Sequence, residues 1–204
     1  MEKPTLNDYP ILEPLRQRWS PLAFSPTPVA RETLLSLFEA ARWAPSCFND
    51  QPWRFVVGSR ADDPETFDKI LATLVEANAA WAKNAPVLIL AVAAGSFRHN
   101  GKPNRWGAYD LGQAVGHLTV QATTLGLAMH QMGGFDPEKA RLELALPEDH
   151  DPLAVMALGF PGKPEDLESD ALRARESNPE RSRIPLKEMV LSGADGWGKT
   201  SPLV

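Results

Sequence analysis

One stretch of the chain decides the fold: Ala-Pro-Ser-Cys-Phe-Asn-Asp-Gln-Pro-Trp-Arg-Phe, residues 44–55. A helical pattern of apolar residues runs into it, and a strand pattern leaves it. Pro45 tends to end the preceding helix, because a residue that precedes proline disfavours the α conformation. Pro52 acts in the same way on its predecessor, and the apolar run Phe55–Val57 then predicts a buried strand. The stretch is therefore a short polar loop that connects a helix to a strand.

The loop between the two prolines is rich in hydrogen-bonding side chains. It offers the hydroxyl of Ser46, the thiol of Cys47 and the amides of Asn49 and Gln51. Side-chain amides both donate and accept hydrogen bonds. This combination suits a planar ligand with several heteroatoms better than a metal ion or a bare phosphate. A purely structural connection with local capping is the alternative.

Two segments together resemble the nitroreductase-like FMN-dependent flavoprotein family. The first is the loop segment 44–55. The second is Arg-Gln-Arg-Trp-Ser-Pro-Leu-Ala-Phe, residues 16–24, which is similar to the family's N-terminal Arg-x-Ser-x-Arg motif for the FMN phosphate. Arg18 and Ser20 match its first two positions, whereas Leu22 replaces the second arginine, so the implied phosphate site lacks one charge. A solvated basic stretch is the alternative for this segment.

Further segments extend the resemblance in the family's order. Asn78 precedes an apolar strand pattern, at the spacing of the asparagine that binds the ribityl chain or ring edge of the flavin; a helix-ending asparagine is the alternative. Gly133 and Gly134 match the glycine turn whose backbone lies beside flavin N5, unless they form an ordinary turn. Arg181 and Arg183 match a basic pair that returns to the phosphate and would supply the missing charge.

The resemblance implies an α+β nitroreductase-like fold, with a mixed, mainly antiparallel sheet flanked by helices, built as an intertwined homodimer with FMN at the interface. It also implies that each FMN contacts both subunits. One subunit would supply Arg18, Trp19, Ser20, Asn78, Arg181 and Arg183. The other would supply Pro45, Ser46, Cys47 and Asn49, with Gly133 and Gly134 near N5.

The implied activity is that of an FMN-dependent NAD(P)H oxidoreductase. In a ping-pong cycle, NADH or NADPH would give hydride to flavin N5, and a nitroaromatic, quinone or related small-molecule acceptor would then take it. The flavin carries the chemistry and the protein supplies orientation and electrostatics, so no catalytic side chain is expected. Two alternatives are an FMN-binding or sensing protein without efficient turnover and a scaffold that has lost the cofactor.

Composition excludes several other classes of protein. With 204 residues, a net charge of −5 and a pI near 5.4, the chain lacks the positive surface of a general nucleic-acid binder. Its longest apolar run, Ala85–Gly95, is shorter than the ~20 residues that span a bilayer, and residues 1–8 lack the apolar core expected of a signal peptide. The single Cys47 indicates a reducing, cytoplasmic location, although a thiol beside a flavin is exposed to redox chemistry. The four histidines lack the spacing of metal ligands.

We expect one domain over residues 1–204, with an irregular N-terminal arm (1–15) and a C-terminal extension (166–204). Cap-and-proline pairs predict three helix starts, at Thr27-Pro28, Asp63-Pro64 and Asp136-Pro137. A near-continuous apolar run, Pro86–Val92, predicts a central strand that is covered on both faces.

Two features have more than one interpretation. A helix is expected from about Tyr109 to Leu125, and Gly112 and Gly116 within it favour close packing of another helix. In the family this helix packs across a homodimer, whereas a contact within one subunit is the alternative. Residues 95–106 form a basic loop with two aromatic residues, which is either a flap over the pocket or an exposed turn.

Overall fold

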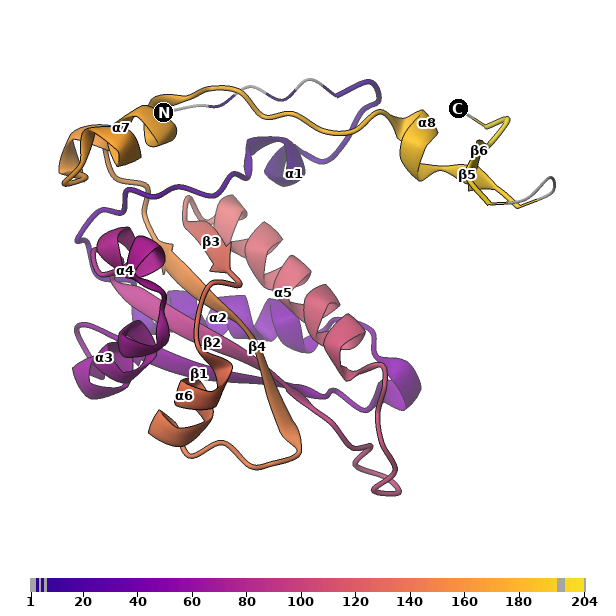
Figure 1. Cartoon of the computed structure of the whole chain (residues 1–204), viewed down its shortest axis with the longest axis horizontal. Helices are drawn as coiled ribbons and strands as arrows, with labels where there is room; N and C mark the ends of the chain where they lie inside the picture. Colours follow the sequence, from indigo (N-terminus) through magenta and orange to yellow (C-terminus); the bar gives the residue numbers. More distant parts are fainter. Residues whose placement is uncertain (1–2, 4, 6, 194–196, 204) are drawn as a thin grey trace.

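A four-stranded antiparallel sheet forms the centre of the computed structural model, which describes residues 3, 5, 7–193 and 197–203 (Figure 1). The strands are β1 (Trp53–Ser59), β2 (Val87–Ala94), β3 (Ala128–Met132) and β4 (His150–Gly159). Their order is β1-β2-β4-β3, and each neighbouring pair is antiparallel. The expected mixed sheet is wrong for the described strands, because β4 inserts between the like-directed β2 and β3 and pairs antiparallel with each.

Two layers of helices cover the sheet, as predicted. Every residue of β2 is buried, and alternate side chains point to opposite faces. Val87 and Ile89 pack in the apolar cluster of one face, and Leu88 and Leu90 in that of the other. The first face is covered by α2 (Arg31–Arg42) and α5 (Gly107–Thr124), and the second by α3 (Pro64–Thr73), α4 (Glu76–Ala82) and α6 (Pro137–Glu143).

Two of the three predicted helix starts are confirmed. The carboxylates of Asp63 and Asp136 accept the backbone N–H groups of Thr66 and Lys139, at 3.1 and 2.9 Å, and each aspartate precedes a proline that opens the helix. The start at Thr27-Pro28 is wrong, since α2 begins at Arg31. Thr27 instead donates its N–H to the Ser25 hydroxyl at 3.2 Å, so a local turn precedes the helix.

The strand that leaves the polar loop is an edge strand. β1 pairs only with β2 in the described sheet, and Phe55–Val57 are half-buried. The prediction of a strand is confirmed, but the expected full burial is wrong, because the outer edge of β1 has no neighbouring strand in the described sheet.

The two terminal segments pack on each other more than the sequence predicted. The arm contains a short helix, α1 (Glu13–Gln17), so residues 1–15 are not irregular throughout. Glu176 of the extension is buried, and its carboxylate accepts the N–H of Leu22 at 2.8 Å. The extension from residue 166 is thus not uniformly exposed, because this carboxylate satisfies a buried backbone donor. The remaining elements are η2 (Pro164–Asp166), α7 (Asp170–Ser177), α8 (Leu186–Met189), β5 (Leu191–Ser192) and β6 (Lys199–Thr200).

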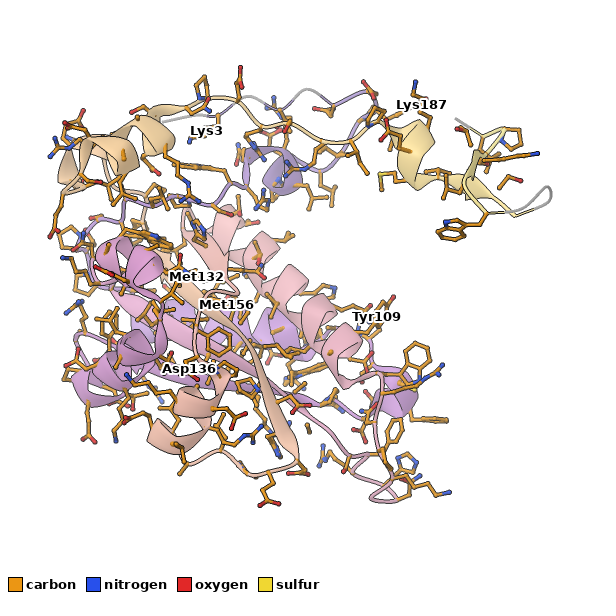
Figure 2. The ribbon with its side chains drawn as sticks, viewed as in Figure 1. Lys3, Tyr109, Met132, Asp136, Met156 and Lys187 are labelled. Carbon is orange, nitrogen blue, oxygen red and sulfur yellow. The ribbon has the colours of Figure 1, made fainter. Side chains whose placement is uncertain are left out.

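Helix α5 carries an exposed face of small residues. A Cβ added at Gly112 or Gly116 would meet no heavy atom of the chain within 4 Å, so the packing alternative within one subunit is wrong. Tyr109 lies on the side of α5 that faces away from the sheet (Figure 2). None of the described helices, α5 included, combines the length and apolar composition that crossing a membrane requires.

Candidate functional site

Three arginines form a positively charged cluster, here called the basic end: Arg18, Arg181 and Arg183. Burial lowers the pKa of Arg18, and the charges of Arg181 and Arg183 lower it further. The Arg18 side chain is half-buried, and no described residue accepts a hydrogen bond from its guanidinium. Like charges held together without an acid destabilise the protein unless an anion binds between them.

Arg181 fastens the terminal segments together at the basic end. Its Nη1 donates to the carbonyl oxygens of Lys3 and Arg16, both at 3.0 Å, and its Nη2 donates to the carbonyl of Arg18. Arg183 donates to the neighbouring Ser182 carbonyl at 2.6 Å. The structure therefore brings the basic pair of the extension to the N-terminal motif, as the sequence predicted.

A pocket of about 680 Å³ opens beside the basic end. Its lining includes Arg18 and Trp19 of the segment 16–24, Thr123 at the end of α5 and Ala128 at the start of β3. Lys3 also lines this pocket, with its Nζ 4.2 Å from the centroid of the Trp19 ring. Sequence analysis missed Lys3, because no motif marks it. Ser20 is exposed, whereas Leu22 is buried in the core and places no polar group in the site.

Asn78 and the glycine turn meet at the end of β3. Asn78 lies within α4, so the interpretation as a helix-ending residue is wrong, and its Nδ2 donates to the Gly134 carbonyl at 3.0 Å. A Cβ at Gly134 would lie 2.6 Å from that nitrogen, so a larger residue there would displace the Asn78 amide. A Cβ at Gly133 would meet nothing within 4 Å, so the backbone at Gly133 is open to a ligand.

The segment 16–24 and β3 connect the basic end to the glycine turn. Ala128, the first residue of β3, lines the same pocket as Arg18, and His130 bonds through Nδ1 to the Pro21 carbonyl at 2.8 Å. Gly133 follows the last residue of β3, so the two places are about 15 Å apart along the strand. This separation suits an elongated ligand with an acidic group at one end and a planar ring at the other.

The polar loop, here called the loop end, is organised by its own side chains and by α5. Ser46 Oγ accepts the N–H of Gln51, and Asp110 of α5 accepts the N–H of Cys47, both at 3.0 Å. Asn49 is exposed and accepts the Gln51 amide at 3.2 Å, and Pro45 is exposed beside it.

The loop end also has a strained backbone. Phe48, Asn49 and Gln51 have φ angles of 54°, 54° and 53°, in the left-handed region that costs non-glycine residues energy. Cys47 and Asn49 bound the short helix η1 (Cys47–Asn49). A loop held in such a conformation presents its groups in a fixed arrangement.

The hairpin 95–106 is attached to the loop end through a buried acid. Asp50 is 4% exposed, and its carboxylate accepts the N–H of Arg98 at 2.8 Å and the side-chain amide of Asn104 at 3.4 Å. Ser96 and Pro103 form a β-bridge, so the segment is an exposed hairpin turn, one of the two expected forms. Sequence analysis missed Asp50 and Asp110, although Asp50 lies within the quoted motif.

The basic end and the loop end lie at opposite ends of α5. Asp110 holds Cys47 near the start of this helix, whereas Thr123 near its end lines the pocket of Arg18. A rise of 1.5 Å per residue separates the two by about 20 Å. One chain therefore does not bring the two predicted sets of site residues together.

Comparisons with known proteins agree with this geometry. A sequence model of the nitroreductase family matches residues 15–160. A solved structure described as an oxidoreductase containing FMN is 34% identical with a TM-score of 0.84, over 92% of this chain and 94% of that one. An uncharacterised 15.4 kDa protein of Mycolicibacterium smegmatis is 33% identical over 71% of this chain and 97% of its own length. A Streptomyces coelicolor protein, provisionally named NADH dehydrogenase/NAD(P)H nitroreductase, is 30% identical over 70% of this chain and 78% of its own.

Proposed function

The chain belongs to the nitroreductase family, and we propose that it is an FMN-dependent oxidoreductase that uses NAD(P)H to reduce nitroaromatic, quinone or related small-molecule acceptors. The observation that carries this proposal is the half-buried guanidinium of Arg18, which lacks an acceptor among the described residues and lies beside two further arginines. Bound FMN would supply the redox chemistry, by accepting hydride from NAD(P)H at N5 and passing it on in a ping-pong cycle.

The residues present fit FMN along the line that runs from the basic end, beside β3, to the glycine turn. Arg18, Arg181 and Arg183 would hold the phosphate, whose two negative charges balance the crowded guanidinium groups. Trp19 and Ser20 follow Arg18 in the chain. Asn78 positions Gly134 through its amide, and the open backbone at Gly133 would lie against the ring.

We propose that the loop end reaches this line from a second copy of the chain. If two α5 helices pack antiparallel across their exposed glycine faces, the start of one lies beside the end of the other. A two-fold axis near Gly116, close to the middle of α5, then brings Pro45, Ser46, Cys47 and Asn49 of one copy towards Arg18 of the other. The distance of about 20 Å that separates these sets within one chain supports this arrangement.

The C-terminal extension gives independent support for a homodimer. It carries exposed apolar side chains, among them Trp197, which is 93% exposed, and Ile184, Met189 and Leu203. The segment with α8, β5 and β6 extends away from the sheet (Figure 1). Lys187 in this segment lies far from the core methionines Met132 and Met156 (Figure 2). Exposed apolar surface of this kind marks a protein interface.

A visible absorption spectrum of the purified protein, before and after anaerobic addition of NAD(P)H, tests the function. We expect an oxidised-flavin band that bleaches with NAD(P)H and returns when a quinone is added. A band that does not bleach would favour a flavin-binding protein without turnover. A colourless protein that also fails to take up added FMN would contradict the proposal.

A further inference from the structure

Three rings gather on the outer side of the loop end. The ring centroid of Phe48 lies 5.9 Å from that of Phe97 and 5.5 Å from that of His99, and the latter two are 5.4 Å apart. Phe48 comes from the loop, whereas Phe97 and His99 come from the hairpin. With Asn49, Asp50 and Arg98, two of these rings line a hollow of about 470 Å³. We call the three rings the aromatic cluster.

The aromatic cluster is costly for the folded chain. Phe48 is 80% exposed, so burial of its ring contributes little to the core, and its φ of 54° adds backbone strain. Asp50 nevertheless fixes the hairpin against the loop, which keeps the three rings together. Exposed, pre-positioned aromatic rings stack readily on planar ligands.

The hairpin next to these rings is positively charged. Residues 95–106 contain Arg98, Lys102 and Arg105 and no acidic residue, in a chain of net charge −5. The side chain of Arg98 lines the hollow and forms no hydrogen bond or ion pair with any described residue. The one acid of the hollow, Asp50, is buried and already accepts two hydrogen bonds, with His99 Nδ1 3.9 Å from it.

We propose that the aromatic cluster and Arg98 bind the electron acceptor, and that they select planar aromatic acceptors that carry an acidic substituent. The rings would stack on the plane of the acceptor, and the Arg98 guanidinium would pair with its carboxylate or other acidic group. This inference rests on the proposed function, because the cluster belongs to the loop that we assign to the flavin.

Two probes of equal shape and different charge test the selection: 4-nitrobenzoate and its neutral analogue 4-nitrobenzamide. Each is titrated calorimetrically into the FMN-loaded, oxidised protein without NAD(P)H, so that binding is measured without turnover. We expect Arg98→Gln to weaken 4-nitrobenzoate about tenfold, since a charge-assisted hydrogen bond is lost. The affinity for 4-nitrobenzamide should be unchanged.

Lys102→Gln is the matched control. It removes the same charge from the same hairpin, but Lys102 does not line the hollow. We expect it to change the affinity for 4-nitrobenzoate by less than about twofold, as a remote exposed charge does. Phe48→Leu should weaken both probes about fivefold, because it removes a ring that lines the hollow and retains an apolar side chain.

The proposal is overturned if Arg98→Gln and Lys102→Gln weaken 4-nitrobenzoate equally, or if the wild-type protein binds neither probe. It is also overturned if Arg98→Gln weakens both probes alike. Flavin content and reduction by NAD(P)H, measured on the same samples, separate the two hypotheses. A protein that binds FMN and oxidises NAD(P)H but shows no Arg98 effect contradicts only the acceptor site, whereas a protein that takes up no FMN contradicts the function itself.

Discussion

The two ends of α5 differ in the sign of their charged groups and in what those groups contact. At the basic end, Arg18, Arg181 and Arg183 crowd positive charge together, and Arg18 lacks a described acceptor. At the loop end, two buried acids, Asp50 and Asp110, each hold backbone N–H groups of the loop and hairpin. The basic end therefore keeps positive charge without a described acidic partner, whereas the acids of the loop end accept hydrogen bonds from nearby backbone N–H groups.

This difference suggests two roles: the basic end would determine how tightly the phosphate binds, and the loop end would determine where the ring lies. A phosphate is recognised mainly through charge-assisted hydrogen bonds, which a cluster of arginines can supply. A flavin ring and its acceptor require fixed positions, because small misplacements reduce hydride transfer strongly. The comparison predicts that substitutions at the basic end change FMN affinity, whereas those of Asp50 and Asp110 at the loop end change stability and local order.

The largest effect is expected at Arg18. Arg18→Ala should weaken FMN binding about 30-fold, because it removes charge-assisted hydrogen bonds to the phosphate. The free energy of unfolding of the FMN-free protein should not fall and should rise by up to about 0.5 kcal/mol, because the substitution removes a like charge from beside Arg181 and Arg183 and breaks no hydrogen bond of the described chain. Fluorescence titration of FMN and urea unfolding measure the two quantities.

Arg31→Ala is the control for this experiment, as Arg31 is an exposed arginine at the start of α2. It should change neither quantity. An Arg18→Ala protein that retains FMN with the affinity of the wild type would remove the basic end from the site.

The second effect is expected at the loop end. Asp110→Ala should cost about 2 kcal/mol of unfolding free energy, because it removes a buried side chain and leaves the N–H of Cys47 without its acceptor. Asp170→Ala, which removes an exposed acid paired with Arg173, should cost less than about 0.5 kcal/mol. Equal losses in urea unfolding would show that the Asp110 contact does not hold the loop.

Much of the layered body is predictable from sequence because its signals are local. Asp63 and Asp136 mark helix starts through a side-chain oxygen and the proline that follows. The apolar run of β2 predicts burial on both faces. The start of α2 was not predictable in this way, since Ala30 precedes the first helical residue and no side chain caps the helix.

The site was predictable only as a set of residues. Arg18, Arg181 and the glycine turn were identified through the resemblance, but nothing in the sequence indicates that Lys3 lines the same pocket. The roles of Asp50 and Asp110 depend on contacts with backbone groups of other segments. Long-range contacts of a side chain with a backbone leave no spacing pattern, so sequence reasoning misses them.

A third experiment uses salt to distinguish the two ends. FMN affinity should fall about fivefold when ionic strength rises from about 0.05 M to about 0.5 M, because counterions screen the attraction between arginines and phosphate. In Arg18→Ala this dependence should be visibly shallower. In Asp110→Ala it should match the wild type, and a shallower dependence there would contradict the division between the ends.

The smallest effect concerns the dependence of stability on pH. Two titratable groups, His130 and Glu176, contact the segment that carries Arg18, and their contributions to stability change in opposite directions with pH. His130 bonds to the Pro21 carbonyl, and burial lowers the pKa of His130 from 6.5, with the charge of Arg175 adding to the effect. The unfolded chain therefore binds this proton more readily, so stability is lost as the pH falls below 6.5. Burial raises the pKa of Glu176, which holds the N–H of Leu22.

Glu176 affects stability in the opposite direction. Its contribution to the free energy of unfolding is complete below pH 4.5, the pKa of an ordinary glutamate, and is lost as the pH rises through the raised pKa. His130→Phe keeps a ring against Trp81, whose centroid is 4.5 Å away. It should therefore reduce the loss of unfolding free energy between pH 7.5 and pH 5, measured in urea. Glu176→Gln should increase that loss, because it removes the group that opposes it. If both variants change the pH dependence in the same direction, the two groups do not oppose each other on this segment.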